Sequence, residues 1–136
     1  MNYLQATEWL EALTDPERRG FGRNFARRMN LDTVRALLSE LGDPHLGLRA
    51  VHIAGTKGKG SVAALVEAAV RAAGYRTALF TSPHLRSWRE RVRFDGRPVS
   101  EQELAHLATV VRPAAERVRG PDGRRPSFFE VYFALA

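Results

Sequence analysis

The sequence of 136 residues contains no cysteine. Disulfide bonds, thiolate nucleophiles and cysteine-based metal sites are therefore excluded. No apolar run approaches the roughly 20 residues that span a bilayer. The first residues also lack the basic and apolar regions of a signal peptide. We expect a cytoplasmic protein that occupies one domain over residues 1–136 and has no membrane partner.

Lysine is almost absent as well. The chain has 21 lysines and arginines together, and two of them, Lys57 and Lys59, are lysines. The formal net charge of +6 favours anionic partners. The arginines are scattered, however, and they do not alternate with aromatic residues as in a single-strand binding surface. We therefore expect anionic small-molecule substrates and no specific nucleic acid.

Both lysines lie in a glycine-rich stretch between an apolar run and a helical pattern. Residues 50–54 predict a buried strand, and residues 61–73 predict a helix. Strand, Gly/Lys/Ser loop and helix in this order are typical of a phosphate-binding loop. Its glycines allow several backbone N–H groups to point at one anion, and the helix N-terminus adds more. The predicted phosphate-binding residues are Gly55, Thr56, Lys57, Gly58, Lys59, Gly60 and Ser61, with Lys59 as the catalytic cation.

A second strand is predicted over residues 77–81, after the helix. A strand, a crossover helix and a second strand predict a parallel pair with a right-handed connection. The fold class we expect is α/β, with a P-loop-type parallel sheet flanked by helices. Loops that follow parallel strands meet at one edge of the sheet, so residues 82–85 should lie beside the phosphate loop.

Helices are also predicted over residues 3–13, 31–41 and 127–136. Residues 89–99 predict a short strand and a turn at Asp95-Gly96. Ser100 and Glu103 form a capping box that opens another helix, which Pro113 should kink or end. The last helix is largely apolar and stops without a C-cap, so we expect an incomplete, truncated domain.

The loop departs from the strict Walker A pattern. That pattern requires glycine where Ile53 stands, and Ser or Thr directly after Lys59, where Gly60 intervenes. The alternative interpretation is a glycine-rich connection that contains two incidental lysines.

With its extra glycine between Lys59 and Ser61, the loop resembles the ATP loop of folylpolyglutamate synthases and dihydrofolate synthases, members of the Mur ligase superfamily. Further motifs match in the same order, from about residue 31 onward. They are Leu41-Gly42-Asp43-Pro44-His45, Thr81-Ser82-Pro83-His84-Leu85, Glu90-Arg91-Val92-Arg93, Gly96-Arg97-Pro98-Val99-Ser100 and Phe128-Phe129-Glu130. The first thirty residues match loosely.

The resemblance implies an ATP-dependent ligase. ATP would phosphorylate a carboxylate of dihydropteroate or a reduced folate, and L-glutamate would attack the resulting acyl phosphate. Lys59 would neutralise the phosphates, and Ser82 and Glu130 would be Mg²⁺ ligands. One hydroxyl and one carboxylate suit Mg²⁺, which keeps water and phosphate oxygens as its other ligands. We expect a monomer.

Each of these residues also has a simpler interpretation. Ser61 is a candidate N-cap, Ser82 before Pro83 a turn residue, and Glu130 the partner of Ser127 in a capping box. We expect His84 to be structural or to line a pocket. The resemblance also suggests that the arginines of residues 18–25 approach the glutamyl carboxylates of the substrate.

Members of this family are much longer than 136 residues. We therefore expect this chain to hold half of a site and to show no ligase activity by itself. Two other functions are possible from the sequence: a cell-wall Mur ligase and a non-catalytic nucleotide- or polyanion-binding module. Gly60 and the Ser82-Pro83-His84-Leu85 motif argue against the Mur ligase.

Overall fold

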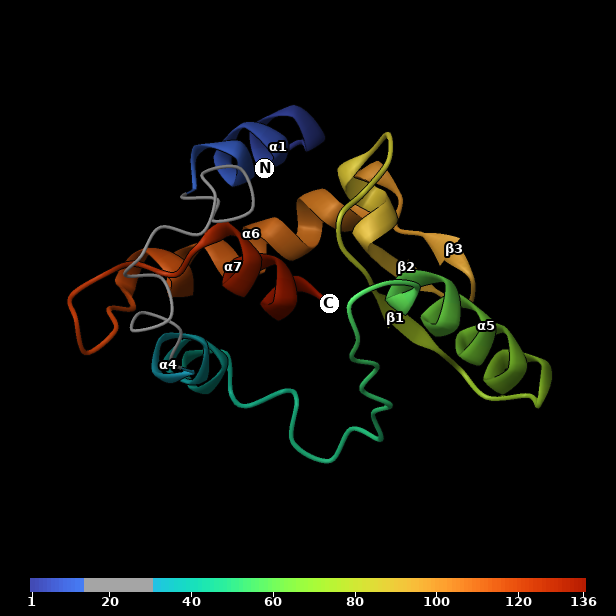
Figure 1. Ribbon diagram of the computed structural model, residues 1–136. Helices are drawn as coiled ribbons and strands as arrows, with labels where there is room; N and C mark the ends of the chain where they lie inside the picture. Colours follow the sequence, from blue (N-terminus) through green and yellow to red (C-terminus); the bar gives the residue numbers. More distant parts are fainter. Residues whose placement is uncertain (14–30) are drawn as a thin grey trace. The chain divides into compact units, whose positions relative to one another are not determined.

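The computed structural model describes residues 1–13 and 31–136 (Figure 1). They divide into two units, one of Met1–Leu46 with Ala105–Leu135 and one of Gly47–Leu104 with Ala136. Helix α6 (Glu101–Arg117) begins in the second unit and continues in the first. The arginine-rich segment at residues 18–25, predicted to approach the substrate, lies outside the described residues.

The first unit is helical. It contains α1 (Tyr3–Ala12), α4 (Asp32–Glu40), most of α6, and α7 (Phe128–Leu135), so the three predicted helices here are confirmed. Of the two effects predicted for Pro113, a kink or the end of the helix, the second was wrong, because α6 continues to Arg117. Proline removes one backbone hydrogen bond, but buried residues on both sides of Pro113, among them Val111 and Ala114, hold the helix in place.

The core of this unit comes from the inward faces of its helices. Leu10 of α1, Leu37 of α4, and Tyr132 of α7 are fully buried. Helix α4 packs against α7, where the rings of Phe128 and Tyr132 have centroids 5.2 Å apart. Each such buried side chain contributes about 1.5–3 kcal/mol relative to exposure. No helix of the described residues combines the length and the apolar character needed to cross a membrane.

The second unit holds α5 (Lys59–Ala72), the short helix η1 (Trp88–Arg91) and a three-stranded antiparallel sheet. The sheet order is β1 (Ala78–Phe80), β2 (Val92–Phe94) and β3 (Arg97–Pro98). The predicted strand and turn are confirmed, since β2 and β3 form a hairpin at Asp95-Gly96. Both turn residues have positive φ, 50° and 79°, as this tight turn requires.

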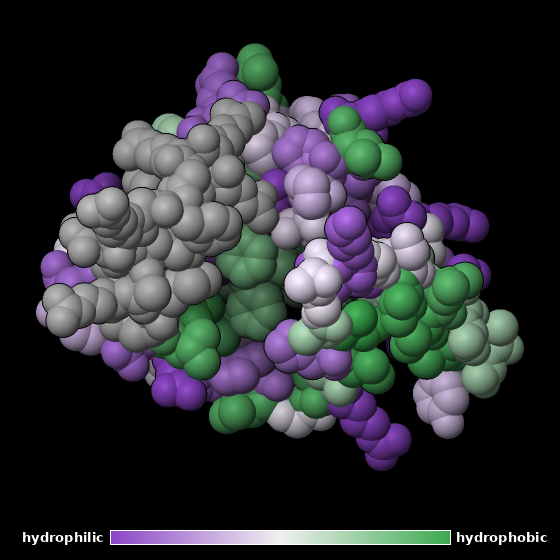
Figure 2. Space-filling model, in the orientation of Figure 1, coloured by the Kyte–Doolittle hydropathy of each residue, from purple (hydrophilic) through white to green (hydrophobic). Residues whose placement is uncertain are grey.

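The predicted parallel sheet is not present among the described residues. Residues 50–54 form no strand, and the Val51 side chain is 71% exposed, while β1 pairs antiparallel with β2. A parallel strand is stable when both of its faces are covered. Here α5 packs on β1 but has no buried residue, and apolar side chains such as that of Leu65 are exposed. Figure 2 shows a green, hydrophobic surface over α5.

Polar contacts fix the C-terminal part of α5 to the start of β1. The Thr77 hydroxyl donates to Glu67 of α5 at 2.6 Å, and the Thr77 N–H donates to Asp95 at 2.9 Å. The Thr77 hydrogen bonds are the main reason that the pKa values of Glu67 and Asp95 lie below their ordinary range. These contacts hold β1, and therefore the loop after it, in a defined position relative to α5.

Candidate functional site

The predicted phosphate loop takes a backbone conformation that depends on glycine. Gly55 has φ 152° and Gly58 has φ 75°, both in the region that side chains disfavour. Gly58 is the N-cap of α5 in the left-handed conformation. The sequence therefore turns directly from an extended segment into the helix, and the loop residues 55–61 are exposed.

No side chain caps the N-terminus of α5. The first intrahelical bond runs from the Val62 N–H to the Gly58 carbonyl at 3.0 Å. In an α-helix the N–H groups of the preceding residues, here Lys59 to Ser61, have no partner within the helix. Together with the positive end of the helix dipole, they form a place where an anion is stabilised. The N-cap interpretation of Ser61 was wrong, because Ser61 is the third residue of α5.

The Lys59 side chain folds back over the loop. Its ammonium donates to the Gly55 carbonyl oxygen at 2.6 Å and lies 3.5 Å from that of Thr56. These bonds hold the positive charge beside the N–H groups of the first turn of α5. Lys59 is thus placed to exchange backbone carbonyls for phosphate oxygens.

Gly60 is the residue that distinguishes this loop from a Walker A motif. Its φ is not positive, and an added Cβ would meet nothing within 4 Å. Neither backbone strain nor packing therefore requires glycine here. The absence of a side chain at Gly60 keeps the first turn of α5 open to a ligand.

The loop after β1 carries Ser82, whose peptide bond to Pro83 is cis. Beyond it, His84 is structural, as one of its two predicted roles requires. Arg91 Nε donates to His84 Nδ1 at 3.0 Å, and the ring of Trp88 lies 4.2 Å from the His84 ring.

Glu130 in α7 accepts four hydrogen bonds. Arg124 binds both carboxylate oxygens, at 2.6 and 2.8 Å, and the Ser127 N–H and hydroxyl each donate at 2.8 Å. The capping box predicted for Ser127 and Glu130 is therefore formed. Burial raises the Glu130 pKa, but the bonds from Arg124 and Ser127 outweigh burial, so its pKa lies below the ordinary value.

The predicted magnesium ligands suit the ion by their chemistry. Ser82 and Glu130 supply the oxygen donors that Mg²⁺ prefers, and Glu130 is held in its charged form. Residues 1–13 and 31–136 contain no group of three or more His, Asp or Glu side chains that could hold a metal. At Glu130 a cation would replace at least one of the bonds from Arg124.

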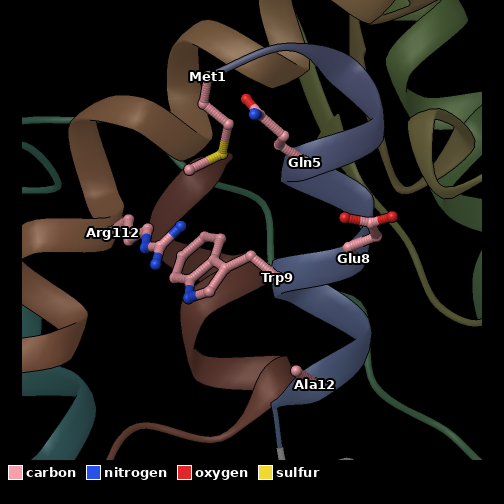
Figure 3. Close-up of a pocket in the computed structure, with 6 residues that line it drawn as sticks. All are labelled: Met1, Gln5, Glu8, Trp9, Ala12 and Arg112. Carbon is pink, nitrogen blue, oxygen red and sulfur yellow. The ribbon is translucent and has the colours of Figure 1, made fainter.

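A separate pocket of about 480 Å³ lies in the first unit (Figure 3). The Arg112 guanidinium of α6 is 5.9 Å from the ring centroid of Trp9 in α1 and pairs with Glu116 at 2.6 Å. The lining residues are Met1, Gln5, Glu8, Trp9, Ala12 and Arg112. None of the residues predicted to bind nucleotide or metal is among them.

Comparisons with known proteins find close relatives. A Bacillus subtilis dihydrofolate synthase/folylpolyglutamate synthase is 34% identical over 112 residues, which are 82% of this chain and 26% of that protein. A probable bifunctional folylpolyglutamate synthase/dihydropteroate synthase of Haloferax volcanii is 42% identical over 114 residues, 84% of this chain and 14% of that protein. This chain belongs to the folylpolyglutamate/dihydrofolate synthase family. No family model matches the sequence.

Solved structures of the family agree with the fold. Folylpolyglutamate synthase of Thermotoga maritima superposes with a TM-score of 0.80 at 34% identity, over 98% of this chain and 29% of that one. The structure of an FPGS–AMPPCP–folate complex superposes with a TM-score of 0.81 at 28% identity, and the match covers 100% of this chain and 31% of that one. The chain thus spans less than a third of the length of these family members.

Two residues of the site region were missed in the sequence. The sequence predicts no role for Arg124, which binds both carboxylate oxygens of Glu130. Glu90 was assigned to a strand, although its carboxylate accepts backbone N–H groups from residues 85–87. Glu90 stands three residues after Ser87, the same spacing that predicted the capping boxes at Ser100 and Ser127, and this spacing was the available signal.

Proposed function

We propose that this chain is the nucleotide-binding part of an ATP-dependent ligase that joins L-glutamate to a carboxylate of dihydropteroate or a reduced folate. The observation that carries the proposal is the uncapped N-terminus of α5 behind two positive-φ glycines, with Lys59 folded over the loop. The family supports it, since its members are folylpolyglutamate and dihydrofolate synthases, and their structures include complexes with AMPPCP, folate and ADP.

The reaction explains why a phosphate site is needed. A carboxylate is a poor electrophile because oxide is a poor leaving group. Transfer of the γ-phosphoryl group of ATP to the carboxylate oxygen gives an acyl phosphate and ADP. The amino group of glutamate then attacks the carbonyl carbon, phosphate leaves, and the amide forms with loss of one proton.

In this reaction the protein must hold two anions together. The N–H groups of Lys59, Gly60 and Ser61 would bind the β- and γ-phosphates of ATP. The Lys59 ammonium would offset the repulsion between the nucleotide and the substrate carboxylate. Such fixed donors stabilise charge without reorganising during phosphoryl transfer, and they provide most of the catalysis in reactions of this kind.

Magnesium, when bound, neutralises phosphate charge. Ser82 would offer its hydroxyl and Glu130 its carboxylate to the ion. Arg124 and Ser127 keep Glu130 ionised and hold its carboxylate in a fixed position. To admit the ion, the Arg124 guanidinium would have to release at least one of the two carboxylate oxygens of Glu130.

Nucleotide affinity tests the proposal, with the two lysines as a matched pair. Equilibrium binding of a fluorescent ATP analogue should fall at least tenfold in Lys59→Ala, equivalent to about 1.4 kcal/mol. Lys57→Ala removes an equal charge two residues away and should lose much less. Equal losses in both variants, with DNA competing as well as ATP, would show a non-specific polyanion-binding module instead.

A further inference from the structure

The loop between β1 and β2, which carries Ser82, is fastened by one carboxylate. Glu90 Oε2 accepts the N–H of Leu85 at 2.9 Å, and Oε1 accepts those of Arg86 at 3.2 Å and Ser87 at 3.0 Å. Glu90 lies in η1, in the yellow segment of Figure 1. Three consecutive backbone donors thus converge on a side chain that is itself half-buried.

These bonds exceed what a helix cap requires. A capping box needs one bond from the carboxylate to the N-cap N–H, and Glu103 in α6 makes this bond to Ser100 at 2.6 Å. In η1 the N-cap is Ser87, so its bond to Glu90 fulfils the same function. The bonds to Leu85 and Arg86 reach outside the helix and order the loop before it.

The neighbouring residue Arg91 fixes the other end of the same loop. Arg91 is 2% exposed, and its carbonyl accepts the Thr81 N–H at 2.9 Å. Its guanidinium Nε binds His84, as described above. Arg91 therefore holds the two residues that flank Ser82 and Pro83, namely Thr81 and His84. Glu90 holds the segment that follows, residues 85–87.

We propose that Glu90 is a positioning residue, which orders the loop at residues 82–87 and so places the Ser82 hydroxyl for Mg·ATP. This inference rests on the proposed function, because Glu90 has this role only if the Ser82 hydroxyl coordinates the Mg²⁺ that is bound with ATP. A carboxylate that collects the N–H groups of a ligand-bearing loop acts through the ligand and does not touch the cation itself. Through its bond to Leu85, Glu90 connects the Glu90-Arg91-Val92-Arg93 motif to the Ser82-Pro83-His84-Leu85 motif.

Substitution by glutamine separates this role from simple stability. Glu90→Gln keeps the size of the side chain but replaces one acceptor oxygen with an NH₂ donor, which faces backbone donors. We expect its affinity for Mg·ATP to fall about tenfold or more, as for other residues that orient metal ligands. Affinity for ATP in EDTA, which depends on the phosphate loop, should not change. Glu90→Asp, which keeps the charge but shortens the side chain, should show the same selective loss if Glu90→Gln fails to fold.

Two further variants make the result decisive. Ser82→Ala should match Glu90→Gln, and the double variant should lose no more than either single variant. Glu103→Gln disturbs a capping carboxylate of the same kind in α6 and should leave both affinities unchanged. If Ser82→Ala weakens Mg·ATP binding and Glu90→Gln does not, the role of Glu90 is refuted and the proposed function stands. If neither does, while Lys59→Ala abolishes ATP binding, the assignment of Ser82 to the cation is itself wrong.

Amide hydrogen exchange gives an independent readout. The N–H groups of Leu85, Arg86 and Ser87 should lose protection in Glu90→Gln and keep it in Glu103→Gln. Unchanged protection in Glu90→Gln would refute the proposal directly, because the three bonds would then not depend on the carboxylate.

Discussion

Arg124 binds both carboxylate oxygens of Glu130, with 2.6 Å from Nη1 to Oε2 and 2.8 Å from Nη2 to Oε1. The two side chains are 27% and 13% exposed. A bidentate guanidinium–carboxylate pair is among the strongest hydrogen-bonded arrangements in proteins. The same pair joins the loop at residues 119–126 to the first turn of α7, so it stabilises the residue that we propose as a magnesium ligand.

Replacing Arg124 by lysine should therefore destabilise the first unit. Lysine keeps the charge but binds as a point donor, so one of the two bonds to Glu130 is lost. We expect the free energy of unfolding in urea to fall by about 1–3 kcal/mol. Arg125→Lys changes the exposed neighbour and should stay within about 0.5 kcal/mol of the parent. Equal effects at the two positions would contradict a specific role for the pair.

Acid should remove the contribution of Glu130. Its folded-state pKa lies below the ordinary value of 4.5, so the folded state binds the proton less tightly than the unfolded state. The stabilisation is complete above the ordinary pKa and is lost as the pH falls through the lower, folded-state pKa. The unfolding free energies of the parent and Glu130→Gln should therefore differ at pH 7 and converge as the pH falls below the lowered folded-state pKa of Glu130. A gap that stays constant over this range would argue against the shifted pKa.

The helices and the glycine-rich loop before α5 could be predicted because their signals are local. Capping residues at Ser100 and Ser127, apolar spacing, and the concentration of both lysines among three glycines require no knowledge of distant contacts. The strand at residues 50–54 could not be judged in this way. An apolar run shows that a segment can be buried, but not whether a neighbouring strand and helices cover it, and here Val51 is 71% exposed. The contacts of Arg124 likewise depend on how its loop folds back on α7.

The glycines of the phosphate loop should differ in what they contribute. Gly58→Ala forces a side chain into a left-handed conformation and should lower stability by about 1–2 kcal/mol. Gly60→Ala meets no neighbour and replaces glycine in the first turn of a helix, so stability should be unchanged or slightly higher. We nevertheless expect ATP affinity to fall about tenfold in Gly60→Ala, because a methyl group would stand where phosphate approaches.

Thermal unfolding and nucleotide titration of the two variants check this prediction together. If Gly60→Ala bound ATP as tightly as the parent, the first turn of α5 would not be the phosphate site. A loss of stability in Gly60→Ala equal to that in Gly58→Ala would instead indicate a conformational requirement at Gly60.

Gly120 and Thr33 should show strong coupling in a double-mutant cycle. A Cβ at Gly120 would lie 2.2 Å from Thr33 Oγ1, and Thr33 is fully buried. Gly120→Ala should therefore cost about 1–3 kcal/mol through overpacking. The Thr33 hydroxyl has no hydrogen-bond partner among the described residues, so Thr33→Ala removes the nearest obstacle without breaking a bond and leaves Asp122 Oδ1 at 3.0 Å from the added Cβ. The double variant Gly120→Ala/Thr33→Ala should recover at least about 1 kcal/mol relative to the sum of the single effects.

The control replaces the hydroxyl without opening space. Thr33→Val puts a methyl group at the position of the hydroxyl, so Gly120→Ala should be as destabilising in the Thr33→Val background as in the parent. Urea unfolding of the four chains in each cycle gives the coupling free energies. Rescue by valine as well as by alanine would mean that the hydroxyl oxygen, and not the occupied volume, opposes a side chain at Gly120. Additive effects in both cycles would mean that the loop at residues 119–126 moves away from α4 and that the close approach of Gly120 to Thr33 is not needed for stability.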